Sequence, residues 1–396
     1  MSVRVYLDWN ATAPPRPEAR DAVLAAMDVL GNPSSVHGEG RAARRLMEEA
    51  REKVARLVGA EPRNVIFTSG GSEANALALT PAIEAGSDKA PRDRLLISAI
   101  EHPSVRSGGV FPATAVEEIP VSASGIVDIA ALEQRLATLK AEGVCRPLVS
   151  LMHANNETGI IQPVAAVANI VHAANGLLHV DAVQTAGRIS CDIAALGADL
   201  LTVSAHKLGG PKGAGAVILR SDTIHFSNPL IRGGGQERGQ RAGTENVSGI
   251  AGFGAAAHAA ARTMAADRAS MSALRARLED GLMAVSPDAV IFGVLVERLP
   301  NTVLFAVPGI KAETALIALD LEGMAVSSGA ACSSGKVAAS HVLAAMGVEP
   351  ALAQGAIRLS LGPTTTEVEI DAFLKAWMKL AKGLSKGLKE RCGLAA

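Results

Sequence analysis

Short apolar runs alternate with longer amphipathic segments over the first two-thirds of the chain. This is the pattern of strands that alternate with helices. It predicts strands at Val65–Thr68, Leu95–Ser98, Ala115–Ile119, Leu148–Met152, Leu177–Asp181, Leu200–Ser204 and Ala216–Leu219. It predicts helices at Glu18–Leu30, Arg41–Val58, Ser72–Glu84, Ile129–Ala141 and Val164–Ala174. Such alternation indicates an α/β domain with a mostly parallel central sheet.

The alternation ends at a long helical region, Val247 to about Val285, whose alanine-rich first part favours a helix. The remainder predicts strands at Val290–Phe292, Thr302–Ala306 and Ala356–Leu361, and helices at Ala312–Leu321 and Glu367–Gly383. The opening segment is too short to fold alone. We therefore expect a large α/β domain over residues 16–260 and a smaller α+β domain formed by residues 1–15 and 261–396.

Composition excludes several classes of protein. The 396 residues are 48% hydrophobic, which is enough for a large core. A net charge of −1 and only 3% aromatic residues argue against a nucleic-acid-binding surface. No apolar run approaches the ~20 residues of a membrane span, and the first residues lack the apolar region of a secretory signal. We expect a soluble cytoplasmic protein without a direct nucleic-acid or membrane partner.

Polar residues or glycines follow five of the predicted strands at the point where each strand ends. They are Gly70-Gly71-Ser72, Glu101-His102, Asn155-Asn156, Asp181 and Lys207. Ligands of open α/β sheets bind beyond the carboxyl ends of the strands, so these residues should share one site. Taken alone, the asparagine pair is also typical of an ordinary turn.

One lysine and one aspartate at successive strand ends suit the chemistry of pyridoxal phosphate (PLP). Lys207 follows an apolar run and precedes glycines, and Asp181 ends the previous strand. A lysine amine holds the PLP aldehyde as a Schiff base, and an aspartate keeps the pyridinium nitrogen protonated so that the ring accepts electrons. The pair predicts a PLP enzyme, although Asp181 by itself could be a structural carboxylate.

The segment after the first strand of the sheet suits a phosphate. Gly70 and Gly71 allow a tight turn into a helix whose first N–H groups favour an anion. Ser72 would add a hydroxyl donor, or it could be an ordinary helix N-cap. Ser204 and His206 offer further donors. The glycine-rich loop 232–246 could close over the same anion from a neighbouring subunit, or it could be a solvated loop.

Three further residues are candidates for catalysis or substrate binding. The imidazole of His102 could lie on the cofactor ring and pass protons, because its pKa is near neutral. Cys332 lies in a stretch of small and polar residues, which predicts a mobile surface loop and favours a nucleophile over an inert thiol. Arg358 lies in a predicted strand of alternating apolar and polar residues. Its guanidinium could bind a substrate carboxylate in two parallel hydrogen bonds, or it could simply face water.

The order of short motifs along nearly the whole chain resembles the cysteine desulfurases of the NifS/IscS type, in the class V aminotransferase family of fold-type I PLP enzymes. The motifs are Tyr6-Leu7-Asp8, Gly31-Asn32-Pro33-Ser34-Ser35-Val36-His37, Thr68-Ser69-Gly70-Gly71-Ser72-Glu73, Glu101-His102, Asn155-Asn156-Glu157-Thr158-Gly159, His179-Val180-Asp181, His206-Lys207, Arg241-Ala242-Gly243-Thr244 and Ser327-Ser328-Gly329-Ala330-Ala331-Cys332. Trp9 departs from the pattern at a position where asparagine is common.

The resemblance implies a role for each candidate. It implies that Lys207 carries the cofactor, that Cys332 receives sulfur and that His102 stacks on the ring and shuttles protons. The other cofactor-binding residues that it implies are Asp181 at the ring nitrogen, Gln184 and Asn156 at the ring oxygen, and Gly71, Ser72, Ser204, His206 and, across a dimer interface, Thr244 at the phosphate. Asn32 and Arg358 would hold the substrate carboxylate.

By the same resemblance, we expect the chain to convert L-cysteine to L-alanine and to pass sulfur from Cys332 to an iron–sulfur scaffold protein or another acceptor. The resemblance also implies a homodimer, and it gives Cys332 a metal contact only through a cluster shared with a scaffold partner. Two alternatives remain open at this point. One is a transaminase or selenocysteine lyase that does not need Cys332, and the other is a scaffold without catalytic activity.

Overall fold

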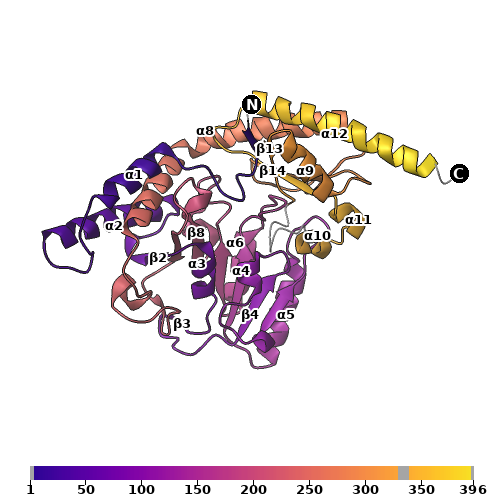
Figure 1. Ribbon diagram of the computed structural model, residues 1–396. Helices are drawn as coiled ribbons and strands as arrows, with labels where there is room; N and C mark the ends of the chain where they lie inside the picture. Colours follow the sequence, from indigo (N-terminus) through magenta and orange to yellow (C-terminus); the bar gives the residue numbers. More distant parts are fainter. Residues whose placement is uncertain (1–3, 329–338, 394–396) are drawn as a thin grey trace.

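The computed structural model describes residues 4–328 and 339–393 (Figure 1). A seven-stranded sheet lies at its centre, with the strand order β2-β9-β8-β7-β6-β4-β5. The strands are β2 (Val65–Thr68), β4 (Arg94–Ser98), β5 (Val116–Ile119), β6 (Pro147–Met152), β7 (Leu177–Asp181), β8 (Leu200–Ser204) and β9 (Gly215–Leu219). All neighbours are parallel except the two pairs that include β9, so the predicted mostly parallel sheet is confirmed.

Helices cover both faces of this sheet, which explains why its central strands are apolar at nearly every position. Successive side chains of β9 alternate between the two faces: Ala216 and Ile218 join one core, and Val217 and Leu219 join the other. The first core is closed by α2 (Gly38–Leu57), α5 (Ile129–Ala141), α6 (Val164–Ala173) and α7 (Ile193–Leu196), and the second by α3 (Gly71–Ala78) and α4 (Pro103–Arg106).

Two predicted helices are wrong at their ends: the helix predicted at Glu367–Gly383 continues to Gly393, and the helix predicted at Ser72–Glu84 is shorter than expected. The corresponding helix α3 ends at Ala78, because Pro81 has no N–H to donate and disfavours helical geometry in the residue before it. The chain instead forms a short strand, β3 (Ile83–Ala85), which pairs antiparallel with β10 (Ile224–Phe226). Short 3₁₀ turns lie at Pro62–Asn64, Ala113–Ala115, Ala205–Lys207 and Gln236–Gly239.

The C-terminal part of the chain builds a second, smaller layer. Its sheet has the order β11 (Val290–Ile291), β12 (Thr302–Ala306) and β14 (Ile357–Ser360). The opening strand β1 (Val5–Tyr6) pairs in parallel with β13 (Met324–Ala325), so the first residues pack with the last part of the chain. The helices are α9 (Ala312–Leu321), α10 (His341–Ala345), α11 (Pro350–Ala353) and α12 (Glu367–Gly393).

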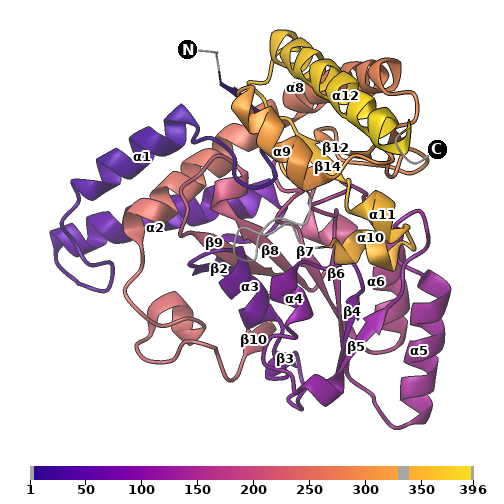
Figure 2. The ribbon, with the colours of Figure 1, turned by 45° about the vertical axis from the view of Figure 1, so that its right-hand side comes forward.

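Two further helices complete the fold: one connects the two layers, and the other packs against it near the start of the chain. The helix α8 (Val247–Val285) passes from one layer to the other, and α1 (Pro17–Met27) packs against it beside α2 (Figures 1 and 2). In α8, Phe253 belongs to the core of the large sheet and Leu278 to the core of the small one. The domain boundary at residue 260 stays a prediction. In the part of the chain that the structure describes, no helix is long and apolar enough to cross a membrane.

Candidate active site

A cavity of about 200 Å³ opens at the carboxyl ends of the parallel strands. Such an edge is where open α/β sheets bind ligands. Nine of the predicted cofactor-binding residues line it: Gly71, Ser72, His102, Asn156, Asp181, Gln184, Ser204, His206 and Lys207. The expectation that separate strand ends form one site is therefore met by the geometry.

Lys207 lies at the end of the 3₁₀ turn after β8, with its amine held by the N-terminal segment. The Nζ atom donates to the carbonyl oxygen of Asn10 at 2.5 Å and to that of Ala11 at 2.9 Å. Burial, and then the positive charges of Arg188 and Arg358, lower the pKa of Lys207 to about 7. Near neutral pH, a large fraction of this amine is therefore uncharged and able to act as a nucleophile.

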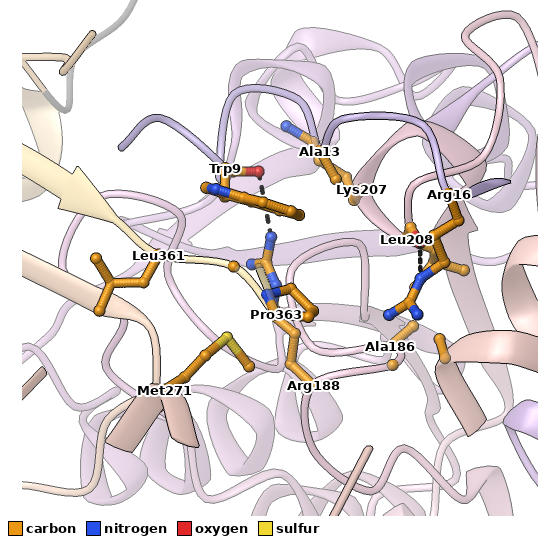
Figure 3. A pocket seen from close by; sticks show the side chains of 13 residues that line it. Trp9, Ala13, Arg16, Ala186, Arg188, Lys207, Leu208, Met271, Leu361 and Pro363 are labelled. Atoms are coloured by element: carbon orange, nitrogen blue, oxygen red, sulfur yellow. Dashed lines mark hydrogen bonds between the residues drawn. The ribbon is translucent and has the colours of Figure 1, made fainter. Parts of the chain in front are cut away.

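A second, smaller cavity of about 20 Å³ lies behind Lys207, with room for about one water molecule (Figure 3). Figure 3 shows the guanidinium of Arg188 beneath the indole of Trp9, whose carbonyl oxygen it contacts. Arg188 donates its other bonds to Asn10 Oδ1 and to oxygens of Gln184. All these acceptors are neutral, so the buried cation is not neutralised by any of them. Burial and the nearby Arg358 lower the pKa of Arg188 to about 10.

Asp181 and His102 occupy the side of the cavity formed by β7 and α4. The Asp181 carboxylate, only 6% exposed, accepts from Val183 N at 2.9 Å and from Asn75 Nδ2 at 2.8 Å. His102 caps α4, and its Nδ1 accepts from the backbone N–H of Ser104 at 3.2 Å. Desolvation by the surrounding protein lowers the pKa of His102, which Asp181 raises in part, so the imidazole is mainly neutral near pH 7.

The N-terminus of α3 and the end of β8 form a cradle that fits a phosphate. The hydroxyl oxygen of Ser204 is buried without a hydrogen-bond partner. Gly71 begins α3 opposite it, and a Cβ at Gly71 would lie 3.2 Å from Val183 Cγ2 and 3.4 Å from Ser204 Cβ, so glycine keeps this space open. A buried unpaired hydroxyl is costly. A PLP phosphate would supply its partner and also bind the free N–H groups of the helix.

Arg358 reaches the site from β14 but is engaged within the protein. It is 2% exposed, it pairs with Asp8 at 2.7 Å, and it donates to the carbonyl oxygen of Asn156 at 2.9 Å. Its Nε is buried without a partner. The residue is therefore next to the cavity, but its predicted role in binding a carboxylate is not tested by these contacts.

Cys332 lies outside the described residues, but the residues on both sides of it are fixed near the cavity. Before it, Ser327 exchanges two backbone hydrogen bonds with Arg358. After it, Ser340 donates to Glu157 Oε2 at 2.6 Å, and His341 contacts the carbonyl oxygen of Glu101 at 2.9 Å. Burial raises the pKa of Glu157, the residue after Asn156. Both ends of the segment are thus held by residues that adjoin the site.

Two predicted site residues are not brought to the cavity of this chain. Asn32 is exposed in the loop between α1 and α2, and Thr244 is exposed after the 3₁₀ turn Gln236–Gly239. Cys145 is exposed and Cys191 is buried. Burial raises the pKa of Cys191 to about 12, so this thiol stays protonated and unreactive near neutral pH.

Sequence reasoning missed four residues of the site and its support: Asn10, Asn75, Ser104 and Arg188. A signal existed for two of them. Asn75 follows Gly71 by four positions on α3, so the two residues share one face of the helix. Ser104 lies in the first turn after His102. Nothing local marks Asn10 or Arg188, because their neighbours in space come from distant parts of the chain.

Comparison with known proteins agrees with this geometry. The family model described as "Aminotransferase class-V" matches residues 5–373. The chain is 44% identical to a cysteine desulfurase of Cereibacter sphaeroides, covering 94% of both chains, and 40% identical to the cysteine desulfurase IscS of Dictyoglomus turgidum, covering 97% of this chain and 96% of the other.

Among solved structures, a NifS-like protein from Rickettsia africae superposes with a TM-score of 0.85 at 36% identity, covering 96% of this chain and all of the other. The full-length match in sequence and the match in fold point the same way. This chain belongs to the aminotransferase class-V family, and within it to the PLP-dependent cysteine desulfurases of the NifS/IscS type.

Proposed function

We propose that this chain converts L-cysteine to L-alanine and collects the sulfur on Cys332 as a persulfide. The observation that carries the proposal is the placement of Lys207, Asp181 and His102 around one cavity, with the ends of the Cys332 segment anchored beside it. PLP, when bound, supplies an electron-accepting ring that stabilises the charge left when the substrate loses its Cα proton.

Each residue of the cavity has a defined task in this proposal. The largely neutral amine of Lys207 would hold the cofactor, and the same amine could take a proton from the Cα atom of the substrate. Asp181 would hold the ring nitrogen, and Asn156 and Gln184, which line the same cavity, would bind the ring oxygen. The phosphate contacts come from Gly71, Ser72, Ser204 and His206. His102, which lines the cavity, would lie against the ring and carry protons.

The sulfur step transfers one atom without an external oxidant. The thiolate of Cys332 attacks the sulfur of the substrate, the Cβ–S bond breaks, and a new S–S bond forms at Cys332. The carbon takes up a proton in place of sulfur, so cysteine and a thiol become alanine and a persulfide. Arg358 would hold the substrate carboxylate in two parallel hydrogen bonds, in place of its present bond to Asp8.

We also propose a homodimer in which Asn32 and Thr244 act in the partner's site. Both are exposed and away from the cavity of their own chain. The same region carries exposed apolar side chains, among them Leu30 (92% exposed) and Val36 (87%), next to Asn32. An exposed apolar patch of this kind is typical of a protein interface. Sedimentation at micromolar concentration tests the dimer.

The acceptor of the sulfur is a separate part of the proposal. An iron–sulfur scaffold protein is the acceptor that we propose first, with Cys332 contacting metal only through a cluster shared with it. A cytoplasmic location belongs to the same proposal, and cell fractionation tests it.

The deciding experiment measures products of the PLP-loaded enzyme with L-cysteine. We expect alanine in the wild type together with one persulfide per chain on Cys332, identified by mass spectrometry of the alkylated peptide. Cys332→Ser should bind cysteine, as seen by a change in cofactor absorbance, but give no persulfide. Lys207→Ala should give no alanine, whereas Lys89→Ala, at an exposed lysine paired with Glu84, should behave as wild type. A persulfide-independent release of alanine by Cys332→Ser at the wild-type rate contradicts the proposal.

A further inference from the structure

The floor of the cavity contains a chain of hydrogen bonds that meets at Asn75. The bonds from Ser150 to Asn75 and from Asn75 to Asp181 are buried, and the chain becomes more exposed from Ser104 to His102. Its side chain is 1% exposed and lies on α3, below the cavity that it helps to line. Asn75 Nδ2 is 2.8 Å from Asp181 Oδ2 and 2.9 Å from Ser104 Oγ, and Asn75 Oδ1 is 2.6 Å from Thr202 Oγ1. One amide therefore touches groups from β7, β8 and α4.

The chemistry of these partners allows only one orientation of the amide. A carboxylate oxygen can only accept, so the atom that faces Asp181 must be the NH₂ group. Its second proton then points to Ser104. The carbonyl oxygen of Asn75 needs a donor, and Thr202 is the hydroxyl that faces it. At this depth a mismatched pair would leave polar atoms unsatisfied, which costs far more than a surface mismatch.

The direction of the bonds behind Asn75 follows from the same reasoning. The Thr202 hydroxyl donates its one proton to Asn75 Oδ1. Its oxygen therefore accepts from His179 Nε2, 3.2 Å away. His179 Nδ1 then accepts from Ser150 at 2.8 Å. This requires a neutral imidazole with its proton on Nε2. Complete burial lowers the pKa of His179 to about 4, which agrees with that form.

The direction of the hydrogen bonds from Asn75 to Ser104 and from Ser104 to His102 determines which ring nitrogen of His102 carries the proton. Ser104 Oγ accepts from Asn75, so its own proton is free to point to His102 Nδ1, 2.8 Å away. The backbone N–H of Ser104 also donates to this nitrogen. With two donors facing Nδ1, a neutral His102 carries its proton on Nε2, the other nitrogen of the ring. Proton exchange by His102 then takes place through Nε2.

We propose that Asn75 is a positioning residue that orients the Asp181 carboxylate and, through Ser104, selects the Nε2–H tautomer of His102. This rests on the proposed function, because it assumes that Asp181 and His102 serve a bound PLP. Asn75 itself acts through these two residues. The chain from Ser150 through His179 and Thr202 holds its amide in the single orientation that serves both.

Four variants separate the two arms of the network. Asn75→Ala removes both arms, and Thr202→Val removes the donor that orients the amide while nearly keeping the shape of the side chain. Ser104→Ala removes only the hydroxyl arm to His102. Ser98→Ala is the matched control, because the Ser98 hydroxyl is also buried at a strand end but has no hydrogen-bond partner.

Two readouts report on the arms without turnover. The dissociation constant of PLP comes from absorbance titration of cofactor-free enzyme. The tautomer of His102 comes from ¹⁵N shifts of histidine-labelled, PLP-loaded enzyme, assigned with His102→Gln. We expect Asn75→Ala and Thr202→Val to weaken PLP binding about tenfold, as loss of an oriented hydrogen bond to a charged group predicts. We expect Ser104→Ala to keep PLP affinity within about twofold and to raise the population of the Nδ1–H tautomer only in part, because the backbone N–H of residue 104 still faces Nδ1. Ser98→Ala should match wild type in both readouts.

The proposal is overturned if folded Asn75→Ala binds PLP as tightly as wild type, or if its His102 keeps the Nε2–H tautomer alone. If Asn75→Ala does not fold, unchanged PLP affinity in Thr202→Val overturns the proposal in its place. Both readouts precede turnover. If the wild-type enzyme makes no alanine, the proposed function is contradicted. If the variants still respond as expected in both readouts, the inference about Asn75 holds.

Discussion

The two sides of the active-site cavity differ in how their charges are matched. On the floor, Asp181 receives two donors, and the residues behind it form a continuous set of donors and acceptors. On the side of Lys207, the guanidinium groups of Arg188 and Arg358 lie behind the residues that line the cavity, and among the described contacts Asp8 is the carboxylate that pairs with one of these three basic groups. The floor is complete without a ligand, whereas the basic side has an excess of positive charge.

This difference separates what the fold builds in advance from what a ligand must supply. A complete hydrogen-bond network holds its members in place before the cofactor arrives, which lowers the cost of binding. Buried cations without matching anions are unfavourable and favour an anionic ligand. The substrate carboxylate fits the basic side, because an arginine fork binds a carboxylate bidentately. The predictions below test this assignment.

The largest effect is expected from Arg358→Ala. Loss of two charge-assisted hydrogen bonds should raise the KM for cysteine about 10- to 100-fold, with a smaller change in kcat. Arg358→Lys should recover only part of the loss, because an ammonium cannot offer two parallel donors. Initial-rate kinetics measure both. Arg63→Ala, at an exposed arginine paired with Asp222, is the control. A KM equal to that of the wild type would mean that the carboxylate binds elsewhere.

The second effect is a pH dependence of cofactor capture by Lys207. Burial and the two arginines lower the pKa of its amine to about 7, and only the neutral amine attacks the aldehyde. The rate of PLP binding to cofactor-free enzyme should be nearly constant above pH 8 and fall about tenfold per pH unit below pH 7. Stopped-flow absorbance measures this rate.

Arg188→Gln sharpens this test. Removal of its positive charge takes away a cause of the lowered pKa, so the midpoint of the Lys207 profile should move to higher pH. Arg63→Gln should leave the profile in place. A wild-type midpoint near that of free lysine, about 10.4, would show that the basic side does not act on the amine.

The smallest effect is expected from Asp8→Asn. Asp8 pairs with the arginine that should bind the substrate, so it competes with the substrate carboxylate. Neutralising it should lower the KM for cysteine about two- to fivefold, the effect of a partly exposed ion pair. Titration calorimetry of cysteine binding to PLP-loaded Cys332→Ser measures the same change without turnover. Weaker binding in Asp8→Asn would show instead that Asp8 positions Arg358.

The sequence by itself determined the main strands, the longer helices and most of the candidate site. Apolar runs with polar residues at their ends placed Asp181, Lys207 and Asn156 at strand ends, and parallel strands bring such ends to one edge. The same local patterns located the longer helices, although α3 ends earlier than predicted and α12 ends later. They did not mark the short elements α4, α7, α10 and α11 or the strand pair β3–β10. The features that they did locate follow from neighbours along the chain, so they can be read without the fold.

Only the tertiary structure decided which side chains pair with one another. Asn75 meets Asp181 across 106 positions of sequence, and Arg358 meets Asp8 across 350. The order of the strands and the return of the opening segment to the C-terminal layer create these contacts. Hydrogen bonds and charge pairs depend on distances of a few ångströms, and local sequence patterns do not determine distances between remote segments.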